Sequence, residues 1–283
     1  VIMAGLRESL ATPPGDIRHH THALVFLCEH PRDPRKDEPG TDWINDAQDH
    51  RACLRTMETA VTLANYIRLL GFEARAHSAA QSDVDLTQLA VAAGLAAVED
   101  GRAVNPFVGA RYGLAVITTT MDMAPDKPIL PGQPPGLAYS AGLGRQAKTA
   151  RTADPFAQRD FKDGAHPFER LKRVDEPTTY IDRANVARVP KRANMFARSL
   201  FGDLGKAAQE GAKNGNYVRK AASAFAFRPS LGALILLQDG ETKDVHPSTA
   251  DPKRNADNIK GALYWLGQDA VGLSECPDWA WYS

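Results

Sequence analysis

One stretch of the chain, from Tyr66 to Pro128, limits the possible folds most, because it orders a helix end, a strand, a second helix and a second strand. A long amphipathic helix over residues 46–70 is predicted, since apolar side chains recur at helical spacing. Its expected buried face consists of Leu54, Met57, Val61, Ala64 and Ile67. Gly71 is placed to end the helix in a left-handed conformation, and residues 72–78 then alternate as a strand should.

The second half of this stretch predicts a short helix and a strong strand. Asp85 can cap a helix that begins at Leu86, because its side chain can accept a backbone hydrogen bond. Residues 112–120 are rich in β-branched side chains, which favour a strand. We expect Val116 and Ile117 to lie at the centre of the sheet, buried against the long helix.

Segments outside this stretch add to the predicted sheet. Residues 22–29 form a continuous apolar run, which is typical of a central strand. Residues 231–237 again have strand character and are expected to join the sheet. Residues 131–182 have no clear period and are rich in Pro, Gly and charge, which indicates a long surface excursion.

Five short motifs follow one another through the chain's most informative stretch. They are Leu70 to Ala74, Leu89-Ala90 with Ala93 to Leu95, Gly109 to Gly113, Thr118 to Asp122, and Asp126 to Pro128. In this order they resemble the corrinoid-dependent reductive dehalogenases and, more distantly, the epoxyqueuosine reductases. The resemblance implies an α+β fold of the nitroreductase-like type, with a mainly antiparallel sheet flanked by helices.

The resemblance also implies cofactors for which this chain lacks ligands. Its relatives carry cobalamin, a corrinoid, and two iron–sulfur clusters of the 4Fe–4S type, which require cysteines at close spacing. Here the cysteines are only Cys28, Cys53 and Cys276. Each is expected to be a small buried hydrophobe. The isolated chain is therefore expected to hold no iron–sulfur cluster and to be inactive.

Parts of two copies of the family pattern occur in the chain. The middle of one copy lies near residues 22–130, and residues 258–275 resemble the opening helix of another. We therefore expect a degenerate corrinoid-reductase-like copy over residues 1–130 and an extended insertion with a basic helical segment over residues 131–230. Residues 231–283 would hold the last strand and the start of a second, truncated corrinoid-binding copy.

This arrangement is similar to that of the soluble, catabolic reductive dehalogenases. The family pattern is cut off at both ends of the chain, so we expect the chain to be the N-terminal portion of such an enzyme. By resemblance its partners are the remainder of the same polypeptide, a halogenated and often aromatic small molecule, and an external electron donor.

Three aromatic residues close the chain. Trp279 and Trp281 would point to the same side of an extended segment, and Tyr282 adds to the apolar wall. In the resembling family this region leads into the corrinoid-binding core, so Trp279, Trp281 and Tyr282 are the expected cofactor-binding residues. Ordinary core packing is the alternative reading of the same aromatic residues.

The overall charge and hydropathy exclude several function classes. Lysines and arginines balance aspartates and glutamates at a formal net charge of zero, so no nucleic-acid partner is expected. No apolar run reaches the length of about 18 residues that a membrane span needs. Three widely spaced cysteines give no disulfide framework, which fits a reducing compartment. With no export signal visible, a cytoplasmic location is expected.

Residues 183–228 carry a local positive charge. Ten lysines and arginines there face only Asp203 and Glu210, which gives a net charge of +8. The segment is either a basic groove for an acidic partner or anionic cofactor tail, or a helical covering whose charges are solvated.

Other candidate chemistry is weaker. His19, His20 and His22, with Glu29 or His30, imitate a metal cluster without a zinc-site spacing, so no metal site is expected. Tyr112 is either a proton donor or a packed tyrosine with a satisfied hydroxyl group. Arg111 either contacts an anionic group or is exposed. No dinucleotide-binding or hydrolase motif is present.

Three functions therefore remain open at the level of sequence. The first is a noncatalytic scaffold within a reductive dehalogenase. The second is a freestanding flavin- or corrinoid-binding reductase of the same fold. The third is a nonenzymatic partner-binding protein that uses residues 183–228.

Overall fold

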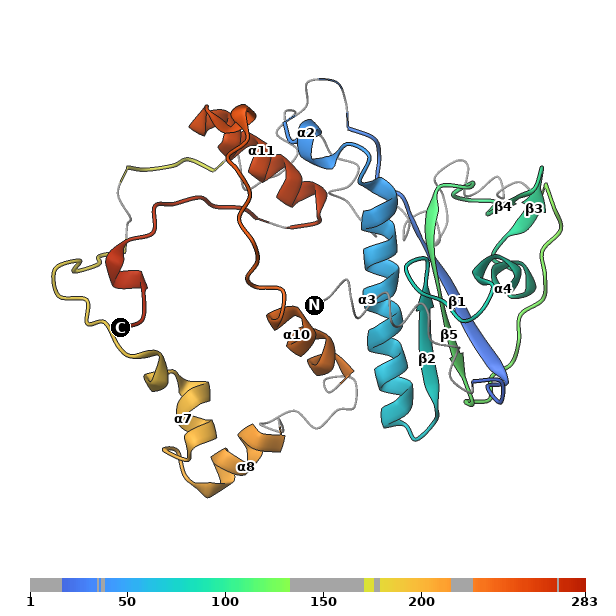
Figure 1. Ribbon diagram of the computed structural model, residues 1–283, viewed down its shortest axis with the longest axis horizontal. Coiled ribbons are helices and arrows are strands. Elements are labelled where there is room, and N and C mark those ends of the chain that lie inside the picture. Colours follow the sequence, from blue (N-terminus) through green and yellow to red (C-terminus); the bar gives the residue numbers. More distant parts are fainter. Residues whose placement is uncertain are drawn as a thin grey trace.

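A computed structural model describes residues 17–34, 36, 39–132, 171–175, 179–214, 226–268 and 270–283. Within these residues the chain has a mixed α/β fold (Figure 1). Its helices and strands are, in order, β1 His22–Glu29, α2 Thr41–Ile44, α3 Gln48–Leu69, β2 Ala74–Ser78, α4 Leu86–Ala92, β3 Ala97–Glu99, β4 Arg102–Val104, β5 Tyr112–Thr119, η2 Lys191–Ala193, α7 Met195–Phe201, α8 Lys206–Asn214, α10 Arg228–Ile235, η3 Pro247–Thr249, α11 Pro252–Trp265 and η4 Asp278–Ala280.

Strand β5 is the centre of a three-stranded antiparallel sheet with the order β1-β5-β2. Its end residue Thr119 pairs with both His22 of β1 and Ala74 of β2. The antiparallel pairing and the central place of Val116 and Ile117 are therefore as predicted, but only Ile117 belongs to the core that packs against α3. The prediction of a central strand over residues 22–29 is wrong, because β1 lies at an edge.

Helix α3 covers one face of this sheet and α4 lies on the other (Figure 1). Ile117 is fully buried in a core of small and branched side chains from both layers, which includes Ala60, Ala64 and Ile67 of α3. The helix ends as predicted at Gly71, whose φ is 95°. Asp85 caps α4 as predicted, since its carboxylate accepts the Gln88 amide at 2.9 Å.

The predicted buried face of α3 is only partly correct. Ala64 and Ile67 are buried, but Leu54 is 66% exposed. The helix instead turns Ala52, Thr56 and Ala60 inward. A Cβ at Gly113 of β5 would lie 2.6 Å from the Ala52 carbonyl carbon, so backbone meets backbone here. Small side chains occupy this face of the helix because a leucine would not fit between the two layers.

Two further elements differ from the sequence prediction. Residues 231–237 do not join the sheet, since Arg228–Ile235 forms helix α10 with a proline in its first turn. The spacing of apolar residues in so short a run is compatible with either a strand or a helix. The proline decides, because it favours the first turn of a helix. The second element, the β3–β4 hairpin, was not predicted. Its turn residues Asp100 and Gly101 both have positive φ, which the Asp-Gly pair favours.

Helix α11 brings the C-terminal part of the chain back to the first part. Asp251 caps the helix, and Ala262 and Trp265 form a small core with Ile44 of α2. The Arg51 guanidinium of α3 lies 5.0 Å from the centre of the Trp265 ring. Helix α11 thus packs against α2 and the start of α3.

Truncating the central strand should be costly. Ile117→Ala is expected to lower the free energy of unfolding by about 2–5 kcal/mol, because it leaves a cavity in the fully buried core. Leu54→Ala, on the exposed side of α3, should change it by less than about 0.5 kcal/mol. Urea denaturation measures both, and equal losses would contradict the helix orientation described above.

The close approach of α3 and β5 gives a second test. Gly113→Ala should destabilise the fold by about 1–3 kcal/mol, because its methyl group meets only backbone atoms that cannot move aside. Gly232→Ala in α10 is the control, because it points into open space and alanine favours a helix. Thermal unfolding separates the two variants, and a neutral Gly113→Ala would show that the layers are not in contact.

Candidate functional site

A network of polar side chains lies on the face of the sheet opposite α3. Nε2 of the buried His77 of β2 lies 3.0 Å from the Thr118 hydroxyl of β5, and the same hydroxyl lies 2.9 Å from Nδ1 of His20. The backbone amide of Asp83 donates to His77 Nδ1 at 3.3 Å. That contact leaves the ring proton on Nε2 of a neutral His77, which donates it to Thr118.

Burial also keeps His77 neutral. The pKa of His77 lies below its ordinary value of 6.5, and the largest cause is desolvation by burial. The nearby Asp83 carboxylate acts in the opposite direction, and Arg75 and His20 lower the pKa further. Arg75 is itself paired with Asp83, at 2.5 Å.

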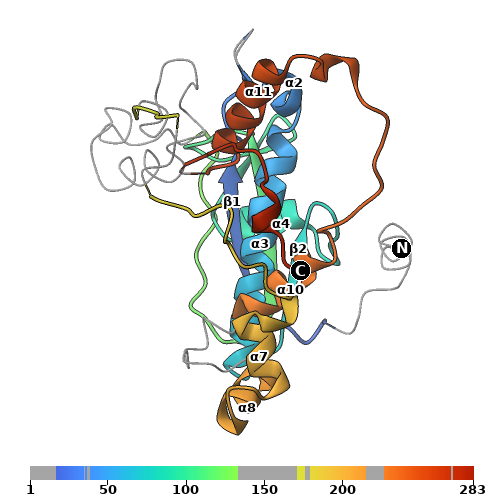
Figure 2. The same ribbon diagram turned by 90° about the vertical axis from the view of Figure 1, so that its left-hand side faces the viewer.

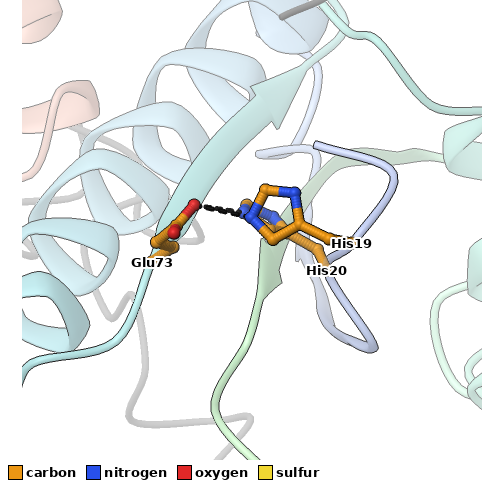
Figure 3. A group of neighbouring side chains, drawn as sticks. All are labelled: His19, His20 and Glu73. Carbon is orange, nitrogen blue, oxygen red and sulfur yellow. Dashed lines mark hydrogen bonds and ion pairs between the residues drawn. The ribbon is translucent and has the colours of Figure 1, made fainter. Parts of the chain in front are cut away.

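His20 lies at one end of this polar network, next to the carboxylate of Glu73. Glu73 lies at the turn between α3 and β2, where its Oε2 is 2.7 Å from Nε2 of His19 and 3.7 Å from Nε2 of His20 (Figure 3). His19 and Glu73 are exposed, whereas the side chain of His20 is only 4% exposed. Sequence reasoning grouped these histidines with Glu29 or His30, and missed Glu73 because it is distant in sequence.

A surface pocket of about 820 Å³ adjoins the same histidines. It is lined by residues of the segment before β1, of β1 and β5, of the loop before α4 and of α4 itself. They include His20, His22, Thr118, Asp83, Val84 and Leu89. A second pocket, of about 430 Å³, lies between α3 and α10 beside Tyr66 and Phe227.

The three aromatic residues at the C-terminus lie elsewhere. A 3-10 turn at Asp278–Ala280 breaks the extended geometry that was expected to align Trp279 with Trp281, so that prediction is wrong. Trp281 and Tyr282 are 59% and 49% exposed, and neither described pocket is lined by them. Their cofactor role remains a prediction.

The C-terminal segment is held to the basic segment through main-chain atoms. The Arg188 guanidinium donates to the carbonyl oxygens of Trp281 and Tyr282, at 3.1 and 2.8 Å. Arg192 forms a two-point ion pair with Asp203. At least these two cations of residues 183–228 therefore serve contacts within the chain. Residues 215–225 lie outside the described residues.

Two residues from the family motifs have structural roles. The Tyr112 hydroxyl donates to the Ala103 carbonyl at 3.0 Å, and burial raises the pKa of Tyr112. Arg111 makes a two-point ion pair with Asp33, at 2.7 and 2.8 Å. Tyr112 is thus a packed tyrosine, and Arg111 is engaged by a carboxylate of the same chain.

The cysteines do not form a cluster site. Cys28, Cys53 and Cys276 form no disulfide bond. The pKa of Cys53 is raised, chiefly by burial, so the thiolate form that binds metal is disfavoured. Cys276 is exposed, so the prediction that each cysteine is buried is wrong for this residue. Among the described residues, no helix has the length and apolar character needed to cross a membrane.

Comparison with known proteins gives a class for the fold. Neither a protein-family model nor a curated protein matches the chain. Solved structures of reductive dehalogenases do match it. One, described as suggesting a mechanism for B12-dependent dehalogenation, is 35% identical with a TM-score of 0.79. The match covers 93% of this chain and 38% of that chain.

A named member of that class matches equally well. The catabolic reductive dehalogenase NpRdhA is 35% identical with a TM-score of 0.77, over 99% of this chain and 40% of that chain. Its complex with 3-bromo-4-hydroxybenzoic acid gives a TM-score of 0.78 over 96% and 40%. The predicted resemblance to catabolic reductive dehalogenases is confirmed, and the chain spans about two fifths of the length of these structures.

The buried His77 predicts how stability depends on pH. Its folded pKa lies below 6.5, so the unfolded chain takes up a proton first as the pH falls. Stability from this residue is fully present above pH 6.5 and decreases below it, by at most about 1.4 kcal/mol per pH unit. We expect His77→Gln to lose less stability than the wild type between pH 7.5 and pH 5.5.

Chemical denaturation at the two pH values measures this difference. His50→Gln is the control, because the side chain of His50 is 84% exposed and far from this network in sequence. An identical loss in the wild type and in His77→Gln would show that folding does not lower the pKa of His77.

Proposed function

We propose that this chain is the N-terminal portion of a cytoplasmic, corrinoid-dependent reductive dehalogenase that removes halide from halogenated aromatic compounds. The observation that carries the proposal is 35% identity to NpRdhA over nearly the whole of this chain but only 40% of that protein. The complex of NpRdhA with 3-bromo-4-hydroxybenzoic acid supports a halogenated phenolic substrate class. A reducing cytoplasm fits widely spaced cysteines that form no disulfide bond.

Within that enzyme the chain acts as a scaffold. An iron–sulfur cluster of the 4Fe–4S type takes four cysteine thiolates, and the residues here do not fit one. Two of the three thiols are partly buried, and Cys53 has a raised pKa. The cluster ligands and the reacting groups therefore belong to the rest of the polypeptide in this proposal.

The exposed apolar side chains of the C-terminal half support a contact with that remaining polypeptide. On α7 they are Met195, Phe196, Leu200 and Phe201, and on and after α10 they include Leu231, Leu234 and Leu236. Soluble domains rarely leave such surface in water without a partner. We propose that residues 231–283 lead into the corrinoid-binding copy, with Trp279, Trp281 and Tyr282 facing it or the corrinoid.

The antiparallel sheet with flanking helices is compatible with a nitroreductase-like fold, which we retain as part of the proposal. The division into a degenerate copy over residues 1–130 and an insertion over residues 131–230 also remains part of it. Residues 133–170 of that insertion lie outside the described residues.

The native protein tests this function directly. Purified anaerobically from its own cells through an affinity tag, the polypeptide that contains this sequence should carry one corrinoid and about eight iron atoms, the content of two 4Fe–4S clusters. It should release bromide from 3-bromo-4-hydroxybenzoic acid with a low-potential reductant. A native polypeptide with neither corrinoid nor iron would contradict the proposal.

The 283-residue chain alone should behave differently. After anaerobic reconstitution with iron and sulfide it is expected to bind no cluster and to release no halide, because it lacks four clustered thiolates. Iron analysis and halide release under the conditions used for the native enzyme measure this. Two clusters bound per isolated chain would show that it is not merely a scaffold.

A further inference from the structure

We propose that His19, His20 and Glu73 form a binding site for a divalent transition-metal ion such as Zn²⁺. The three side chains come from two places far apart in sequence, the turn before β1 and the turn after α3 (Figures 1 and 3). One ligand atom from each lies within 4.8 Å of the others.

The separations suit one small ion. Zinc binds imidazole nitrogen and carboxylate oxygen at about 2.0–2.2 Å, so neighbouring ligand atoms in a tetrahedral site lie about 3.3 Å apart. Glu73 Oε2 is 2.7 Å from His19 Nε2 and 3.7 Å from His20 Nε2, values on either side of this separation. His19 and Glu73 are exposed, so their side chains have room to rotate toward an ion.

The backbones that carry the ligands are fixed to the same end of β5. The Thr21 amide donates to the Thr119 carbonyl at 3.1 Å, which holds the histidine turn. The Glu73 carbonyl accepts the Thr119 hydroxyl at 2.6 Å and the Thr120 amide at 3.1 Å. The two sides of the site are therefore positioned before an ion arrives, and binding does not have to order a loop.

Thr118 orients the least exposed ligand. Zinc-bound histidines usually donate their other ring N–H to an oxygen acceptor, which fixes the ring. His20 Nδ1 has the Thr118 hydroxyl at 2.9 Å for that purpose. A hydroxyl oxygen has two lone pairs, so it can accept from both His20 Nδ1 and His77 Nε2 when an ion occupies His20 Nε2.

The donor set determines the kind of ion. Two imidazoles with one carboxylate favour zinc, nickel, copper or cobalt over magnesium and calcium, which prefer all-oxygen sites. Three protein ligands leave a fourth position for water, as in open zinc sites. Without an ion the same groups would form an exposed ion pair, which contributes little to stability.

Titration of the full 283-residue chain with ZnCl₂, against a chromogenic chelator, tests the site. We expect one Zn²⁺ per chain, and at least about tenfold weaker binding in Glu73→Gln and in His19→Gln. Glu73 holds β5 through its main-chain atoms, so glutamine keeps those contacts. Equal melting temperatures of the metal-free proteins confirm that the variants fold.

His50→Gln is the matched control, because His50 also pairs with a carboxylate, Asp49 at 2.9 Å, but without a second histidine. It should bind Zn²⁺ as the wild type does. Unchanged affinity in Glu73→Gln and His19→Gln would assign the ion to other groups, the cysteine thiols included, and overturn the proposal. If one Zn²⁺ per chain binds only above about 100 µM Zn²⁺, the proposal is overturned as well.

Discussion

The contact between the backbones of α3 and β5 is the constraint on which the rest of the fold depends. Gly113 leaves no side chain between the layers, and Ala52 meets it from the helix. Once this contact is made, Ala60, Ala64 and Ile67 reach Ala115 and Ile117 and close the core. The helix must then end near Gly71, so that the chain can return as β2 beside the same strand.

The other face of β5 has a different chemistry because side chains alternate along a strand. Gly113, Ala115 and Ile117 face the helix, while Thr118 joins His77 and His20. Thr119 and Thr120, at the end of the strand, hold the turn that carries Glu73. The same strand therefore builds the apolar core and positions the polar cluster, through residues only one or two positions apart.

The sequence was sufficient for the elements with strong local signals. The Gly71 helix end, the Asp85 cap and the β-branched strand through Ile117 are set by residues next to them in the chain. The orientation of α3 was not, since it depends on Gly113, about sixty positions away in the chain. The pairing of Glu73 with His19 and His20 was missed for the same reason. The α10 helix was missed because its apolar run has no distinctive period.

The chain thus combines a packed unit around β5 with a C-terminal half whose apolar side chains are largely exposed. Figure 1 shows α7 and α8 apart from the sheet, on the other side of α3, and Figure 2 shows α8 below the lower end of the sheet. These helices also contact each other more than they contact the sheet. In the proposed function, the rest of a longer dehalogenase polypeptide would cover these exposed side chains, in line with the similarity of this chain to two fifths of NpRdhA.

Hydrogen exchange, followed by mass spectrometry, tests this division most directly. In the 283-residue chain alone, amides of β5 should exchange slowly, while those of α7 and α10 should exchange rapidly. In the native protein, β5 should be unchanged and α7 and α10 should become protected by the added polypeptide. If α7 and α10 are as protected as β5 in the isolated chain, the chain is complete by itself and the scaffold account is wrong.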